Sequence, residues 1–353
     1  MSANGSLDDR YAHQVFLAMI PAPLVAVDVG GTHTKIRITS MTDRDATLEV
    51  AHVIDNRSDM LELLRETLIA NTASTPNYCV LSAAGPVDGT AQVRMTNWSR
   101  ERLISVSDLS IAGVDVQRAT VVNDMVVSAL GIVAQNVDRG GPAAWARQLT
   151  DGAQAIPGGN MVVIMPGTGL GVAGVVHTGT NPNAGYHVVP CELQHAPIGH
   201  LSPAQAQVAQ RMRDRLDMPR PSWESFSCGH GLVRVHQMLS NADAPLLDAG
   251  SIARKAIAGE DSVCREALEL FYLCAGGIAQ LTALSFLPTG GVYLSGRSSK
   301  LNEAFIVDSQ FVTELRNNDT HGELLDDYPV YLVTQDTNLD GGIFLARTKR
   351  ARL

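Results

Sequence analysis

The chain has 353 residues, of which 45% are hydrophobic and 18% are charged, which excludes a disordered or coiled-coil protein and allows two domains. Its 36 acidic and 27 basic side chains give a net charge of −9, which argues against binding of nucleic acid or an anionic membrane through overall charge. The five cysteines form no CxxC pair, so we expect neither a disulfide framework nor a zinc knuckle, but a reducing, cytoplasmic environment.

Residues 1–21 are expected to be an N-terminal extension and no signal peptide, because charged residues precede only a short apolar run. The uncharged stretch 270–296 is interrupted by Pro288 and several glycines. It therefore predicts a buried helix followed by a buried strand, and no membrane span. The C-terminal Ala351-Arg352-Leu353 resembles a peroxisomal address only loosely, and its meaning stays open.

Two strand–glycine loop–strand units are predicted along the chain. The first runs from strand 24–29 through Gly30-Gly31-Thr32 to strand 35–39, and the second from 161–165 through 166–171 to 172–176. Further short strands are expected at 78–81 and 119–122, and helices at 61–70, 126–133, 203–216 and 262–287. This mixture predicts an α/β architecture that divides just after Asp124.

Each glycine loop is able to direct main-chain amides at an anion such as phosphate, because glycine reaches positive φ and turns tightly. Thr168 adds a hydroxyl donor to the second loop. No Gly-Lys-Ser/Thr follows, so neither loop is a Walker A motif, and the first opens into a strand, unlike a dinucleotide-binding loop. Two ordinary tight hairpins are the alternative interpretation.

Two aspartates stand at strand ends. Asp28 precedes the first glycine loop and would repel phosphate unless Mg²⁺ lay between them, held through water; the alternative is a turn aspartate. Asp124 follows Asn123 at the end of strand 119–122, where it is either the N-cap of the next helix or a general base.

Glu192, His195 and Glu224 form the third group of polar candidates. The spacing Glu192-x-x-His195 would suit metal ligands on a helix, but the second half of a zinc motif is missing and Pro190 and Pro197 favour a loop. Carboxylates and an imidazole also suit sugar hydroxyls, because they offer both acceptors and donors.

Taken in order, these motifs resemble the bacterial-type glucokinases, ATP-dependent hexokinases of the actin-like ATPase superfamily. The resemblance covers roughly residues 22–345 and rests on seven motifs in sequence. They are Asp28-x-Gly-Gly-Thr32, Ala84-Gly-Pro-Val87 with Thr96-Asn97, Asn123-Asp124, Gly167-Thr-Gly-Leu-Gly171, Glu192-x-x-His195, Glu224 before Cys228-Gly-His-Gly-Leu232, and Gly290-Gly-Val-Tyr-Leu-Ser-Gly296.

The resemblance implies an α/β, two-domain actin-like ATPase (ribonuclease H-like) fold with a deep interdomain cleft. The small domain is expected at 22–125 with 337–353, and the large domain at 126–336. It also implies a cytoplasmic homodimer that transfers the γ-phosphoryl group of ATP to the 6-hydroxyl of glucose with Mg²⁺, the first step of glycolysis. Nucleic acid and membrane are not expected partners.

The resemblance also assigns residue roles. Asp124 is implied as the catalytic base and Asp28 as the residue near Mg²⁺, through water. Sugar ligands are implied at Asn97, Asn123, Asp124, Glu192, His195 and Glu224. ATP-binding positions are implied at Gly30, Gly31, Thr32, Gly167, Thr168, Gly169, Gly291 and Gly296.

The chain departs from the family pattern at three places. His33 replaces the usual Asn, with Lys35 near the usual Arg; Leu193-Gln194 replaces Gly-Gly; and Cys228-Gly-His230-Gly replaces Ser-Gly-Pro-Gly. The sugar therefore stays open: the alternatives are a related kinase of another hexose or N-acetyl sugar, or a non-catalytic sugar sensor. The role of residues 1–21 and the use of ADP or polyphosphate as donor also stay open.

Overall fold

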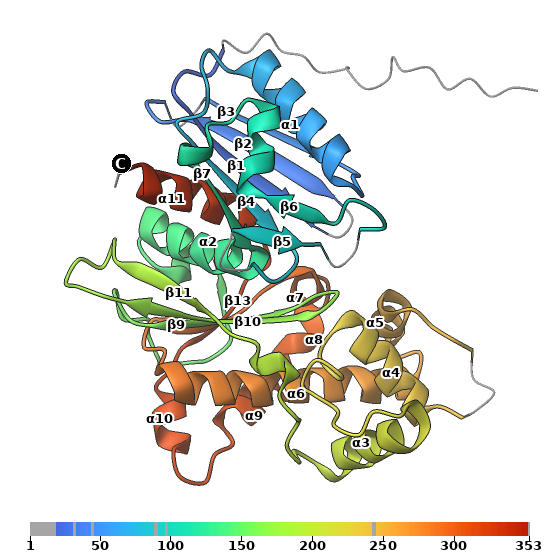
Figure 1. Cartoon of the computed structure of the whole chain (residues 1–353). Helices are drawn as coiled ribbons and strands as arrows, with labels where there is room; N and C mark the ends of the chain where they lie inside the picture. Colours follow the sequence, from blue (N-terminus) through green and yellow to red (C-terminus); the bar gives the residue numbers. More distant parts are fainter. Residues whose placement is uncertain are drawn as a thin grey trace, which may run out of the picture. The chain divides into compact units, whose positions relative to one another are not determined.

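A computed structural model describes residues 19–30, 33–43, 46–87, 91–95, 98–241 and 245–351. Two compact units are distinguished (Figure 1). Unit 1 comprises the chain up to Val127 together with the residues from Gly342 onward, and unit 2 comprises Ser128–Gly341. Gly31, Thr32, Asn97, Arg352, Leu353 and most of the N-terminal extension lie outside the described residues.

Unit 1 is built on a five-stranded sheet with the order β3-β2-β1-β4-β7. The strands are β1 (Pro23–Val29), β2 (Thr34–Ser40), β3 (Thr47–His52), β4 (Tyr78–Ala83) and β7 (Ala119–Asn123). The first three form an antiparallel meander, and β4 and β7 run parallel to β1. Every residue of β1 and β4 is buried, as their continuous apolar runs predict for central strands.

Helices cover this sheet. Helix α1 (Arg57–Asn71) packs Leu64 and Leu68 into the apolar core and is capped by the Asn56 side chain, which accepts from the N–H of Asp59. Helix α11 (Asn338–Arg350) brings Gly342 against Ala26 of β1, where a Cβ would lie 2.6 Å from the Ala26 methyl carbon. Smaller elements are the hairpin β5 (Gln92–Arg94) and β6 (Leu103–Ser105) and the 3₁₀ turns η2 (Val106–Ala112) and η3 (Val116–Arg118).

Unit 2 repeats the same strand pattern in a six-stranded sheet, β11-β10-β9-β12-β13-β8. The strands are β8 (Arg147–Gln148), β9 (Met161–Pro166), β10 (Leu170–His177), β11 (Tyr186–Pro190), β12 (Gly291–Leu294) and β13 (Val330–Leu332). Again a three-stranded antiparallel meander is continued by two parallel strands. The predicted α/β class and the two strand–glycine loop–strand units are thus confirmed.

The longest helix of unit 2 is α6 (Ser262–Phe286), whose buried residues belong to the apolar core of this unit. This helix is long and apolar enough to cross a membrane, but 78% of its most apolar window is buried inside the folded chain, so it is the core helix that the sequence predicted. The others are α2 (Asp124–Arg139, which begins in unit 1), η4 (Pro142–Ala144), η5 (Leu193–His195), α3 (Pro203–Leu216), α4 (Gly229–Leu239), α5 (Ala249–Ala258), α7 (Arg297–Leu301), α8 (Glu303–Val307), α9 (Phe311–Arg316) and α10 (Gly322–Asp326).

Candidate active site

Asp28 lies near the end of β1 with only 7% of its surface exposed. Its Oδ1 accepts a hydrogen bond from the Ser82 hydroxyl on the neighbouring strand β4, at 2.8 Å. At the following turn the N–H of Gly30 donates to the carbonyl of His33 at 3.0 Å. The Gly30 amide therefore closes the turn, and of the first loop's three predicted phosphate positions it is the one that the structure describes.

Asp124 is the first residue of α2, directly after β7. The Asn123 side chain accepts from the N–H of Met125 at 2.8 Å, as an N-cap does, and donates to the carbonyl of Gly85 at 2.8 Å. Asp124 Oδ1 accepts from the same Met125 N–H at 2.9 Å. Because Asn123 shares the capping role, helix α2 does not depend on the Asp124 carboxylate alone.

The environment of Asp124 makes its carboxylate a stronger proton acceptor than usual. Burial and the negative charge of Asp28 raise the pKa of Asp124 to about 6, while the hydrogen bond from Met125 acts in the opposite direction. A carboxylate with a pKa near 6 is ionised at neutral pH and still accepts a proton readily. This is the property that a general base needs.

The second glycine loop, residues 167–169, connects β9 and β10. The Gly167 N–H donates to the Gly169 carbonyl at 2.7 Å and closes the turn, so it is not free for an anion. The N–H groups of Thr168 and Gly169 make no hydrogen bond within the described chain and are exposed. These two amides, with the Thr168 hydroxyl, are the groups of this loop that are able to bind phosphate.

The expectation that this loop needs glycine for positive φ is wrong. Neither Gly167 nor Gly169 nor Gly171 has a positive φ. The reason for glycine at position 169 is a close approach: a Cβ there would lie 3.0 Å from Oε2 of Glu224. The same Oε2 accepts from the N–H of Leu170 at 2.9 Å, which fixes the carboxylate against the loop.

Glu192, His195 and Glu224 lie together in unit 2. His195 Nε2 is 3.4 Å from Glu192 Oε2, and His195 Nδ1 is 3.9 Å from Glu224 Oε1. The main-chain N–H of Glu224 donates to the Gln194 carbonyl at 3.0 Å and holds the two segments side by side. The exposed imidazole between two carboxylates is a surface of alternating donors and acceptors, which suits a polyhydroxyl ligand.

This group is held on a turn and not on an α-helix, since Glu192 precedes the single 3₁₀ turn η5. A different trio, His236, Asp261 and Cys264, is the one group of described residues whose ligand atoms are close enough to hold a metal ion. There Asp261 Oδ1 already accepts the N–H groups of Val263 and Cys264 as the N-cap of α6. Asp261 therefore has a structural role that needs no metal.

Gly296 lies where the second glycine loop begins. Its φ is +97°, and a Cβ would lie 2.9 Å from Met165 Cγ and 3.1 Å from the Pro166 carbonyl oxygen. Only glycine fits this conformation and this approach without strain. The structure therefore brings Gly296 and the loop 167–169 to the same end of the sheet.

Gly291, predicted as an ATP-binding position, does not lie beside this loop. Gly291 opens β12 and is paired with Met161, the first residue of β9, so it lies at the other end of both strands. Its φ is +116°, and a Cβ would lie 3.0–3.1 Å from the rings of Tyr331 and Tyr293. Glycine at this position is explained by packing against tyrosines.

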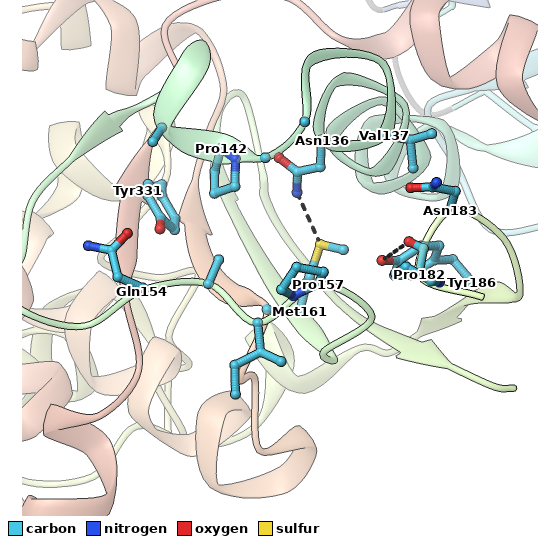
Figure 2. Close-up of a pocket in the computed structure, with 16 residues that line it drawn as sticks. Asn136, Val137, Pro142, Gln154, Pro157, Met161, Pro182, Asn183, Tyr186 and Tyr331 are labelled. Carbon is cyan, nitrogen blue, oxygen red and sulfur yellow. Dashed lines mark hydrogen bonds between the residues drawn. The ribbon is translucent and has the colours of Figure 1, made fainter. Parts of the chain in front are cut away.

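The end of the unit 2 sheet at which Gly291 lies carries a pocket of about 330 Å³ (Figure 2). Prolines and tyrosine rings line it, among them Pro142, Pro157, Tyr186 and Tyr331. Asn136, also in the lining, donates from Nδ2 to Met161 Sδ (Figure 2). It also donates to the Tyr293 hydroxyl oxygen. No described residue that lines the pocket is charged, so the pocket lining offers no carboxylate to act as a general base.

Two residues that contact the candidate site residues were not predicted from the sequence. Ser82 hydrogen-bonds Asp28 from within a buried apolar strand, where a lone hydroxyl was the available signal. Gln194 donates to Glu192; the sequence marks it only as a departure from a glycine pair. The Ser82 contact depends on the pairing of β4 with β1, and the Gln194 contact depends on the orientation of its side chain.

The two sheets repeat one strand order and each carries a glycine turn after a buried central strand, which defines a two-sheet α/β fold. A family model described as Glucokinase matches residues 24–348. The glucokinase of Mesorhizobium japonicum is 30% identical over 317 residues, which are 88% of this chain and 87% of that protein. The chain belongs to the glucokinase family of ATP-dependent sugar kinases.

Solved structures show the same fold. A glucokinase from an Antarctic psychrotroph superposes with a TM-score of 0.75 at 23% identity, over 93% of this chain and 99% of that one. The Balamuthia mandrillaris glucokinase, in a complex with glucose, has a TM-score of 0.76 at 21% identity, over 92% and 93% of the two chains.

Proposed function

We propose that this protein is a glucokinase, which converts glucose and ATP to glucose 6-phosphate and ADP at the first step of glycolysis, with Asp124 as the general base. The observation that carries this proposal is the half-buried Asp124 carboxylate, whose pKa burial and Asp28 raise to about 6. In the step proposed, the 6-hydroxyl oxygen bonds to the γ-phosphorus as its proton passes to Asp124. The bond from that phosphorus to the bridging oxygen breaks, and ADP leaves.

Asn123 and the cluster of Glu192, His195 and Glu224 are proposed as sugar ligands. The Asn123 amide donates to Gly85 and to Asp124, and its oxygen keeps one lone pair beyond the bond from Met125, so it is able to accept from a hydroxyl. The Glu192, His195 and Glu224 group offers further acceptors and an imidazole. Asn97, which lies outside the described residues, keeps its proposed role as a further ligand.

For ATP, the structure supports a narrower set than the sequence predicted. The free N–H groups of Thr168 and Gly169 are proposed to bind phosphate oxygens, with Gly296 at the same end of the sheet. Gly31 and Thr32 remain proposed on the resemblance alone, and so does Gly291, whose position at the other end of β12 gives it no support. Such positioning and charge neutralisation are what phosphoryl transfer chiefly requires.

Asp28 is proposed as the residue near Mg²⁺. The donor set fits this ion: a buried carboxylate oxygen is a hard ligand, and the charge of Asp28 already raises the pKa of Asp124. A nearby cation would relieve this repulsion between carboxylates. When bound, Mg²⁺ supplies neutralisation of the charge on the transferring phosphoryl group.

We also propose that the protein is a homodimer in the cytoplasm, and light scattering after gel filtration tests the dimer.

The catalytic proposal is tested by incubating the purified protein with ATP and Mg²⁺ against glucose, mannose, fructose, N-acetylglucosamine and N-acetylmannosamine. We expect the highest kcat/KM with glucose. Turnover of another sugar with glucose inert would overturn the substrate assignment, and glucose binding without ATP turnover would indicate a sensor.

A further inference from the structure

Gln194 lies in η5 between the proposed sugar ligands Glu192 and His195. It is buried, with 7% of its surface exposed. Its side-chain Nε2 donates to Glu192 Oε2 at 2.5 Å. Its main-chain carbonyl accepts the N–H of Glu224 at 3.0 Å. Gln194 thus contacts both carboxylate residues of the cluster.

The orientation of the Gln194 side chain is determined by charge. Turning the amide over would place Oε1 against the Glu192 carboxylate, and two acceptors repel each other. In the observed orientation Oε1 is buried and has no hydrogen-bond partner. A buried acceptor without a partner lowers the stability of the folded chain. Stability alone therefore does not explain why an amide side chain stands at position 194.

Glu192 is the residue that gains from the contact. Its side chain is 70% exposed, so on its own it would occupy many rotamers. The Gln194 amide and His195 both face Oε2, at 2.5 Å and 3.4 Å. Oε1 of Glu192 is therefore the oxygen left to accept from a ligand.

We propose that Gln194 is a positioning residue that holds Glu192 in the orientation in which Oε1 accepts a sugar hydroxyl. The proposal rests on the proposed role of Glu192 as a sugar ligand. Because Gln194 contacts Glu192 and not the loop 167–169, it acts on sugar affinity and not on ATP. Ordering one long side chain in advance corresponds to an affinity gain of about 3- to 10-fold.

The test is a double-mutant cycle with Gln194→Met, Glu192→Ala and the double variant. Met keeps the length of Gln and removes the amide, and Gln194→Leu serves if Gln194→Met does not fold. KM for glucose and for ATP and kcat are measured, and glucose Kd is measured by calorimetry without ATP. Gln148→Met is the matched control, because Gln148 also donates from Nε2, to the Ala153 carbonyl, on the opposite edge of the same sheet.

We expect Gln194→Met to raise KM and Kd for glucose about 3- to 10-fold, with kcat and the ATP KM within about twofold of wild type. In the Glu192→Ala background the same substitution is expected to change neither constant further. Gln148→Met is expected to leave all of them unchanged.

Three results would overturn the proposal, and they differ in what else they overturn. If Glu192→Ala raises KM but Gln194→Met does not, the positioning role fails and the sugar-binding role of Glu192 stands. Additive effects in the double variant show that Gln194 acts on something other than Glu192. If Glu192→Ala leaves glucose binding unchanged, the sugar-ligand assignment fails first, and the positioning role falls with it.

Discussion

The Glu224 carboxylate accepts a hydrogen bond from the main-chain N–H of Leu170 at 2.9 Å. This bond joins the group proposed to bind sugar hydroxyls to the loop proposed to bind phosphate, and both lie within unit 2. One oxygen of Glu224 faces the loop and the other faces His195. A change in the loop at this point is therefore expected to affect sugar and nucleotide together.

Replacing Gly169 by alanine tests this coupling. The new Cβ would lie 3.0 Å from Glu224 Oε2, so the carboxylate has to move away from Leu170. Because the end of a glutamate side chain moves easily, we expect the variant to fold, with kcat/KM for glucose and for ATP lowered about 10-fold or more. Steady-state kinetics measures both constants.

Gly322→Ala is the control for that substitution, because a Cβ at Gly322 makes only an ordinary contact of 3.6 Å with the Arg316 carbonyl oxygen. It is expected to keep both constants at the wild-type value. A Gly169→Ala enzyme with unchanged kinetics would contradict the coupling of the loop to Glu224.

Asp124→Asn is expected to stabilise the fold while it removes activity. Because the folded-state pKa of Asp124 is raised to about 6, its ionised form lowers stability above that pH, and this penalty fades as the pH falls from about 6 to 4. Asparagine is neutral and still accepts from the Met125 N–H. Thermal unfolding should show a gain of about 1–3 kcal/mol at pH 8 and a smaller gain at pH 5. Equal gains at both pH values would contradict the shifted pKa.

The pH dependence of turnover follows from the same group. A base must be deprotonated to act, so kcat/KM for glucose is expected to fall about 10-fold per pH unit below about pH 6. Asp28→Asn removes the negative charge beside the base and should move this limb to lower pH in whatever activity remains at saturating Mg²⁺. If the fall of kcat/KM at low pH is not shifted in Asp28→Asn, a group other than Asp124 controls the pH dependence.

The two glycines around β12 should separate nucleotide binding from stability. Gly296→Ala introduces a Cβ beside Met165 and Pro166 at positive φ, next to the phosphate loop, and should raise the KM for ATP. Gly291→Ala at the far end of the strand should lower the unfolding temperature by clashing with Tyr331 and Tyr293, with the ATP KM of the folded enzyme unchanged. A raised ATP KM in Gly291→Ala would instead support the nucleotide-binding role that the resemblance implies for Gly291.

The strands and glycine turns could be predicted because their signals are local. Continuous apolar runs ending in glycine, such as residues 24–31 and 161–169, mark central strands and their turns. The helix after Asn123 could be predicted in the same way, since an Asn-Asp pair at a strand end favours an N-cap.

What the sequence does not predict is which residues approach one another in the folded chain. Gly291 and Gly296 share one predicted motif, but four residues separate them, and the pairing of β12 with β9 places them at opposite ends of the strand. The sequence suggested that Gly169 is needed for a positive φ. The structure shows another reason: Glu224, far away in the sequence, lies so close that a Cβ at position 169 would crowd its carboxylate. The sequence also does not predict the hydrogen bond from Gln194 to Glu192, because this bond depends on the orientation of both side chains.

The most direct test of the central claim compares wild type and Asp124→Asn in a coupled assay for glucose 6-phosphate at pH 8, with ATP and Mg²⁺ in excess. Calorimetry of glucose binding is run on the same two preparations. A general base is worth about 10²- to 10⁴-fold, so the account predicts a loss of kcat in that range with glucose still bound and the fold intact. An Asp124→Asn enzyme that retains wild-type kcat would contradict it.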